Sequence, residues 1–211
     1  MVELTAEEQR VLGCLIEKEA TTPDQYPLTM NSLLLACNQS TNRDPVVLYD
    51  QDTVTKALTT LRENQLTRVV YPAHARATKY RHVLGEVWAL TEQELAVLAV
   101  LMLRGPQTGS ELRARTDRYA SFDDLGGVEG VLDRLGSRPE PMVVRLERQP
   151  GQREERFAQL LGGAVEAAPW TPPAPSAARA GSALEALQAE VAALRAEVDS
   201  LQEAVNHLLG R

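Results

Sequence analysis

Aromatic residues, cysteine clusters and long apolar runs are scarce or missing in this sequence of 211 residues. Aromatic residues make up 4% of the chain and hydrophobic residues 44%, so leucine, valine and alanine must form most of the core. No apolar run approaches the roughly 20 residues of a membrane-spanning helix. The opening residues MVELTAEEQR lack the basic and apolar regions of a signal peptide. We therefore expect a cytoplasmic protein with no membrane contact.

An excess of positive charge is also missing. The formal net charge is −7, spread as −2 over residues 1–89, −2 over residues 90–162 and −3 over residues 163–211. Proteins whose affinity comes from phosphate contacts are usually basic over at least the binding domain. Because no segment of this size is basic, the charge balance argues mildly against nucleic acid.

Signatures of catalysis and metal binding do not occur either. Cys14 and Cys37 belong to no C-x-x-C motif or Cys/His cluster, so we expect two reduced thiols on the inner faces of helices. His74, His82 and His207 have no nearby cysteine or paired carboxylate and predict no metal site. Glycine-rich phosphate loops and common hydrolase motifs are absent from the sequence. We expect a protein that is not an enzyme and uses no cofactor.

An internal repeat is the most informative feature that is present. LTAEEQRVLGCLIEKE at 4–19 resembles LTEQELAVLAVLMLRG at 90–105, and each copy begins with the Thr-x-x-Glu pattern of a helix capping box. VTKALTTL at 54–61 and VEGVLDRL at 128–135 share the apolar spacing of a helix. A stretch typical of a β-hairpin follows each of them. Helix, helix, helix and hairpin, twice over, is the plan of a winged helix.

The repeat leads to a prediction of fold class and domain boundaries. We expect an α+β protein, mainly α, with two tandem winged-helix domains followed by a proline- and alanine-rich linker and a C-terminal coiled-coil helix. The expected segments are a first winged-helix domain over 1–89, a second over 90–162, the linker over 163–182 and the coiled-coil helix over 183–211.

The last segment carries an unbroken heptad pattern of leucine and valine. Valine occupies three of the four a positions of the heptad, and leucine occupies every d position. This combination favours a parallel two-stranded coiled coil, so we expect a homodimer. The alternative is an amphipathic helix that packs on its own domain. The residues of the expected dimer seam are Leu184, Leu187, Val191, Leu194, Val198, Leu201, Val205 and Leu208.

Three stretches resemble the YceH family of uncharacterised bacterial proteins: ACNQSTNRDPV at 36–46, KYRHVL at 79–84 and LMLRGPQTGSELRARTDR at 101–118. The resemblance covers about residues 4–160 and implies two tandem winged-helix domains. It implies little about activity, because the family has no established biochemical function. The chain departs from the family at the first hairpin tip, which reads AHARA at 73–77 in place of a Gly-Ser-Arg run.

A polar run, NQSTNRDP at 38–45, separates the second and third expected helices. In one interpretation these residues only satisfy the loop backbone, with Asn38 ending one helix and Asp50 capping the next. In the other, the run is an exposed binding loop, because loops on a rigid scaffold often carry function. The residues of this candidate interaction loop are Asn38, Gln39, Asn42 and Arg43.

The third helix of the first repeat and the following hairpin form the candidate contact surface for double-stranded DNA. Five basic residues face one acid between Arg62 and His82, a net charge of +4. Such a strip can follow phosphates, although exposed strand faces are also often charged without binding anything. The outward face of the helix carries Asp52 and Glu63, which a helix in the major groove normally avoids. The candidate contacts are Lys56, Thr59, Arg62, Arg68, Arg76, Lys79 and Arg81.

Two functions remain open from the sequence. One is a dimeric protein that binds DNA or regulates transcription, an inference that rests largely on analogy between folds. The other is an adaptor whose winged-helix domains bind a protein partner without DNA. The basic first hairpin favours DNA, whereas the negative total charge and the acidic third helix favour the adaptor.

Overall fold

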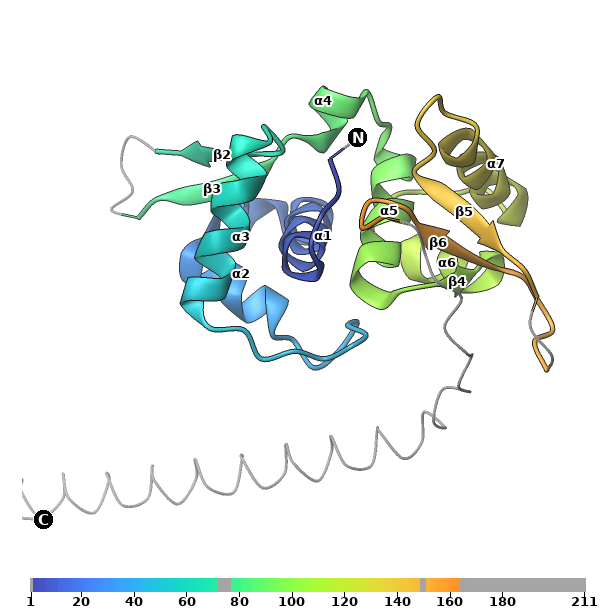
Figure 1. Ribbon diagram of the computed structural model, residues 1–211, viewed down its shortest axis with the longest axis horizontal. Helices are drawn as coiled ribbons and strands as arrows, with labels where there is room; N and C mark the ends of the chain where they lie inside the picture. The colour runs from blue at the N-terminus through green and yellow to red at the C-terminus, as the bar shows by residue number, and fades with distance from the viewer. Residues whose placement is uncertain (1, 72–76, 149–150, 164–211) are drawn as a thin grey trace, which may run out of the picture. The chain divides into compact units, whose positions relative to one another are not determined.

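The computed structural model of the protein describes residues 2–71, 77–148 and 151–163 (Figure 1). Over these residues the fold is α+β and mainly α, with two small antiparallel sheets. The first half contains α1 (Ala6–Thr21), the 3₁₀ helix η1 (Pro23–Gln25), β1 (Leu28–Thr29), α2 (Met30–Cys37), α3 (Gln51–Glu63), β2 (Thr67–Val70) and β3 (Lys79–His82). The short helix α4 (Leu84–Trp88) leads to the second half, which contains α5 (Glu92–Arg104), β4 (Gln107–Thr108), α6 (Gly109–Thr116), α7 (Leu125–Gly136), β5 (Val143–Leu146) and β6 (Arg156–Gln159).

Both halves use the same order of elements. In each, a helix, a very short strand and two further helices precede a hairpin. The strand orders are β1-β3-β2 and β4-β6-β5, so the last strand of each half lies in the middle of its sheet. The repeat read from the sequence therefore corresponds to two halves with equivalent topology. Neither short strand was predicted, because two residues carry no measurable alternation.

Helix starts follow the predicted capping chemistry. The hydroxyl of Thr5 accepts from the amide of Glu8 while the Glu8 carboxylate accepts from the Thr5 amide, and Thr91 and Glu94 repeat the arrangement. Each box satisfies two backbone amides that have no partner inside the helix. Asp50 caps α3 with a single hydrogen bond, in which its carboxylate accepts from the Thr53 amide, as expected.

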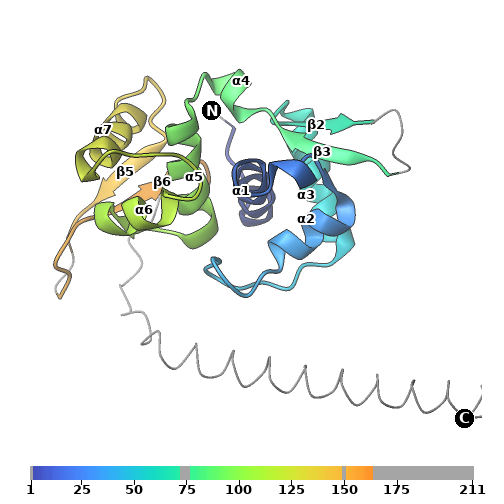
Figure 2. The same ribbon diagram turned by 180° about the vertical axis from the view of Figure 1, so that it is seen from behind.

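Helices α1 and α5 pack against each other at the centre of the described residues (Figures 1 and 2). Gly13 permits the close approach, because a Cβ at this position would lie 2.9 Å from Cγ of Leu103. Every residue from 96 to 103 on α5 is buried, as expected for a helix that is apolar on all sides. One continuous apolar core therefore extends through both halves.

Candidate nucleic-acid interface

The hairpin β2–β3 presents three basic side chains on one face. Arg68 pairs directly with Arg81 across the two strands, and Val70 pairs with Lys79. Because side chains alternate along a strand, Lys79 and Arg81 lie on the same face as Arg68. Thr67 lies on the opposite face and is buried. The basic face is therefore the outward face of the hairpin.

Glu86 on α4 lies against this basic face. Its carboxylate accepts a hydrogen bond from Nη1 of Arg81 at 2.8 Å, and its other oxygen lies 3.3 Å from Nη1 of Arg68. Two arginines directly opposite each other in a sheet repel, and the carboxylate offsets that repulsion. The hydrogen bond from Arg81 holds the pKa of Glu86 below its usual value. Two cations of the expected basic strip are thus already paired within the chain.

Helix α3 runs beside the hairpin and exposes the remaining described candidates (Figures 1 and 2). Lys56, Thr59 and Arg62 are exposed to solvent, while the apolar stripe predicted for this helix is buried. Asp52 and Glu63 share the exposed surface, as the helical spacing predicted. The surface that α3 offers is therefore mixed in charge, and the denser group of cations belongs to the hairpin.

Several predicted site residues lie outside the described residues. Arg76 belongs to the hairpin tip at 72–76. The whole expected dimer seam also lies outside the described residues, namely Leu184, Leu187, Val191, Leu194, Val198, Leu201, Val205 and Leu208.

Asn38 and Tyr49 connect the two ends of the polar loop. Nδ2 of Asn38 donates to the carbonyl oxygen of Tyr49 at 2.8 Å, and Oδ1 of Asn38 accepts from the Tyr49 amide at 2.8 Å. Asn38 also ends α2, as predicted. Asn42 is exposed, with a φ of 59°. Asn38 thus satisfies the loop backbone, whereas a binding role for Asn42 stays a prediction.

Arg43 is buried, and the expectation that it is exposed in the loop is wrong. Its guanidinium is 0% exposed and forms a bidentate pair with Glu17 on α1, with N–O distances of 2.5 and 3.1 Å. It also donates to the carbonyl oxygen of Ala36 and to Oε1 of Gln39, at 3.0 and 2.9 Å. A buried arginine requires a paired anion, and Glu17 supplies it from a distant part of the sequence. Gln39, another residue of the candidate interaction loop, thus binds Arg43 inside the molecule.

The same ion pair connects the two halves of the chain. The hydroxyl of Tyr119, just after α6, donates to Oε1 of Glu17 at 2.8 Å. The amide of Asp44 donates to the carbonyl oxygen of Leu103 on α5 at 2.9 Å. Burial acts to raise the pKa of Glu17, but the hydrogen bonds from Arg43 and Tyr119 outweigh burial and keep this pKa below its usual value. We call Glu17, Arg43 and Tyr119 the buried network.

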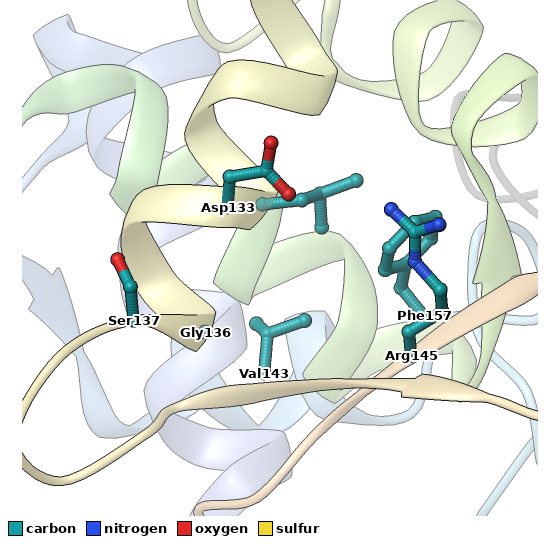
Figure 3. Close-up of a pocket in the computed structure, with 7 residues that line it drawn as sticks. Asp133, Gly136, Ser137, Val143, Arg145 and Phe157 are labelled. Carbon is teal, nitrogen blue, oxygen red and sulfur yellow. The ribbon is translucent and has the colours of Figure 1, made fainter.

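A cavity of about 400 Å³ lies in the second half, between α7 and the hairpin β5–β6 (Figure 3). Val143 and Phe157 contribute apolar surface, and the guanidinium of Arg145 lies over the Phe157 ring, 5.3 Å from its centroid. Asp133 and Ser137 line it from α7. The cavity thus combines apolar surface with one side chain of each charge.

Sequence reasoning missed Glu86 and the partners of Arg43. Glu86 had a readable signal, since it is the only acid between Glu63 and Glu92. Glu17 had none, because it lies 26 residues from Arg43 in sequence and its pattern is that of an ordinary helix surface residue.

Neither membrane crossing nor metal binding is indicated within the part of the chain that the structure describes. No helix there combines the length and the apolar character that a bilayer crossing requires. No group of three or more His, Cys, Asp or Glu side chains among these residues is placed to hold a metal ion.

Comparison with known proteins identifies the family. The chain matches the family described as "Protein of unknown function, DUF480" over residues 4–152. It is 44% identical to a UPF0502 protein of Aliivibrio fischeri over 211 residues, covering 97% of each chain. A UPF0502 protein of Pelobacter propionicus is 46% identical over 97% of this chain and 95% of its own. One from Geobacter metallireducens is 52% identical over 76% of this chain and 73% of its own. The resemblance to a bacterial protein family is confirmed: the chain belongs to the DUF480 family, together with these UPF0502 proteins.

Proposed function

We propose that this protein is a DNA-binding or transcription-regulatory protein built from two tandem winged-helix domains. The equivalent topology of the halves supports the domain assignment, because each places a helix directly before a two-stranded hairpin, as winged-helix proteins do. The heptad pattern over 183–211 supports a parallel homodimer. Two copies of the first half would then be available to one duplex, which strengthens binding without any new contact.

The outward face of the hairpin β2–β3 is the observation that carries the proposal. Cross-strand pairing puts Arg68 and Arg81 opposite each other, with Lys79 on the same face. Lys79 has no ion-pair partner among the residues that the structure describes. Three cations on a strand face beside an exposed helix form a surface on which a phosphate backbone fits.

Most of the affinity in this proposal comes from phosphates. On α3, Lys56 and Thr59 are the residues with the reach to touch base edges, but Asp52 and Glu63 lie on the same exposed surface. Carboxylates close to a phosphate backbone repel it, so α3 contributes little to affinity. The protein therefore binds duplex DNA with weak sequence preference.

Replacing the hairpin cations tests this proposal. The variant Arg68→Ala, Lys79→Ala, Arg81→Ala should weaken binding to all duplex sequences alike, by about tenfold or more near physiological salt, because each phosphate contact contributes to affinity. The matched control removes the same charge from the second hairpin, as Arg145→Ala, Arg148→Ala, Arg153→Ala, and should change affinity much less. Fluorescence anisotropy on a random duplex measures both. Equal affinity of the two variants would contradict the assignment of the interface.

A protein-binding adaptor is the second candidate, and the cavity beside α7 favours it. The outward side of α7 carries one base and one acid among residues with little reach into a groove, namely Gly126, Gly130, Asp133, Arg134 and Ser137. The cavity offers Val143 and Phe157 to an apolar anchor side chain from a partner. If the parent protein fails to bind duplex DNA at low salt, this second function becomes the better account of the fold.

A further inference from the structure

Exposed apolar side chains flank the polar loop on both sides. Leu35 on α2 is 63% exposed, and Val46 and Leu48 in the connection to α3 are 57% and 92% exposed. Exposure alternates along this connection, because Val47 and Tyr49 are half-buried between exposed neighbours. An alternation with a period of two is typical of an extended chain that lies with one face on the protein. Figure 1 shows the connection at the lower margin of the first half.

Both ends of this extended segment are fixed to the rest of the molecule. Arg10 is 3% exposed; its Nη2 donates to the carbonyl oxygen of Pro45, and its Nη1 donates to that of Cys37 at 3.4 Å. Like the other cysteine, Cys37 is buried, as predicted. At the far end, the side chain of Asn38 binds both the amide and the carbonyl group of Tyr49. The chain between these anchors is therefore held in place before any partner arrives, which lowers the entropy cost of binding.

The middle of the segment leaves its backbone groups unpaired. None of the amides and carbonyls of residues 46–48 has a hydrogen-bond partner within the part of the chain that the structure describes. In an extended chain, the amide and carbonyl of one residue point to one side, and those of the next residue point to the other. Because both groups of Tyr49 point to Asn38, those of Val46 and Leu48 point away from it. Residues 46–48 therefore resemble the unpaired edge of a β-sheet.

Exposed acids surround the same segment. Asp44 precedes it, and Asp50 and Asp52 follow it. Lys56, one helical turn after Asp52, is the only cation between residues 44 and 61. Like charges opposite each other in a sheet repel, so pairing with the same segment of a second copy is unfavourable. The charge around the segment instead favours a strand with basic neighbours.

We propose that residues 46–48 form a binding site for another protein, which adds an extended segment to this edge through backbone hydrogen bonds. The partner segment has apolar residues at alternate positions, which pack beside Val46 and Leu48. It has lysine or arginine at its ends, which face Asp44, Asp50 and Asp52. Main-chain hydrogen bonds give such a contact its affinity, and the side chains give its specificity. The site uses no residue of the outward face of β2–β3, so it does not depend on DNA binding.

Binding of a synthetic peptide to the folded full-length protein tests the proposal. The probe is the fluorescently labelled peptide KKVTVTVKK, and the control is EEVTVTVEE, which keeps the apolar pattern but has acidic ends. Fluorescence anisotropy should show saturable binding of the basic peptide below about 1 mM. The acidic peptide should bind at least about tenfold more weakly. Failure of the basic peptide to bind, or equal binding of the two peptides, would overturn the proposal.

Hydrogen exchange of the parent protein, followed by NMR, tests the backbone pairing directly. The basic peptide should slow the exchange of the Val46 and Leu48 amides at least about tenfold and change that of Val47 less, because only the first two amides point outward. Peptide binding without protection of these two amides would place the peptide elsewhere on the acidic surface and overturn the proposal.

Two variants at one position separate the backbone from the side chain. Leu48→Ala and Leu48→Pro both remove the leucine side chain, but only Leu48→Pro removes the amide hydrogen. Leu48→Pro should therefore bind the basic peptide at least about fivefold more weakly than Leu48→Ala. The position is exposed and its amide has no internal partner, so we expect both variants to fold, which circular dichroism checks.

Equal affinity of the two folded variants for the basic peptide would contradict strand addition. Light scattering that shows Leu48→Pro to be a smaller oligomer than the parent would assign the segment to a contact between copies of this chain, which also overturns the proposal. If Leu48→Pro does not fold, the exchange measurement on the parent protein decides.

Discussion

Arg43 joins the polar loop to Glu17 on α1, and the Glu17 carboxylate in turn accepts a hydrogen bond from Tyr119 of the second half. Removing one partner of a buried ion pair leaves the other charge without compensation. Arg43→Met should therefore lower the free energy of unfolding by about 3 kcal/mol in urea denaturation. As a control, Arg113→Met breaks the exposed pair with Asp117 and should lower it by less than about 0.5 kcal/mol. Equal losses in the two variants would show that the buried network contributes no more than a surface pair.

The ionisation of Glu17 adds a pH dependence to this residue-scale prediction. Its folded-state pKa is lowered, so its contribution to stability is present above the unfolded pKa and is lost as the pH falls through the folded pKa. The stability difference between the parent and Arg43→Met should accordingly shrink below about pH 4. A difference that stays constant from neutral to acidic pH would mean that Glu17 is not the anion that Arg43 requires.

At the scale of elements, helix α4 limits the charge of the hairpin β2–β3. Glu86 occupies the position between Arg68 and Arg81 where a phosphate would bind. Glu86→Gln should therefore raise the affinity for a random duplex by about threefold or more and steepen its salt dependence. As a control, Glu147→Gln removes the same charge from an exposed residue directly after β5 and should change the affinity less. If the parent binds DNA and the Glu86→Gln variant does not bind it more tightly, then Arg68 and Arg81 do not contact phosphates.

The elements also show how far the sequence could lead. The sequence predicts the helix starts at Thr5, Thr91 and Asp50, because capping involves only residues within one helical turn. The apolar stripe of α3 is likewise predicted by helical spacing alone. α4 could not be foreseen, since it has five residues and no side-chain cap. The burial of Arg43 could not be predicted from the sequence either, because it depends on the Glu17 carboxylate, which only tertiary packing brings close.

At the scale of the whole molecule, the two halves, proposed to be winged-helix domains, and the heptad segment should have separate roles. The proposed dimer depends on residues 183–211. The described hydrophobic core, by contrast, is formed within one chain, with α1 and α5 packed together at its centre. A chain ending at Gly163 should therefore be a folded monomer, while the full-length protein is a dimer. Light scattering of both forms decides this. A truncated protein that remains dimeric would place the interface within the two halves, and a monomeric full-length protein would favour packing of the heptad segment on its own domain.

Binding of the parent protein to a random DNA duplex across a salt series tests the central claim most directly. If the outward face of β2–β3 contacts phosphates with Arg68, Lys79 and Arg81, the logarithm of the association constant should fall linearly with the logarithm of the salt concentration. The expected slope for each bound hairpin is about −2, because Glu86 offsets one of the three cations. Fluorescence anisotropy provides the measurement. No binding at the lowest salt concentration, or binding that is independent of salt, would contradict the proposed function.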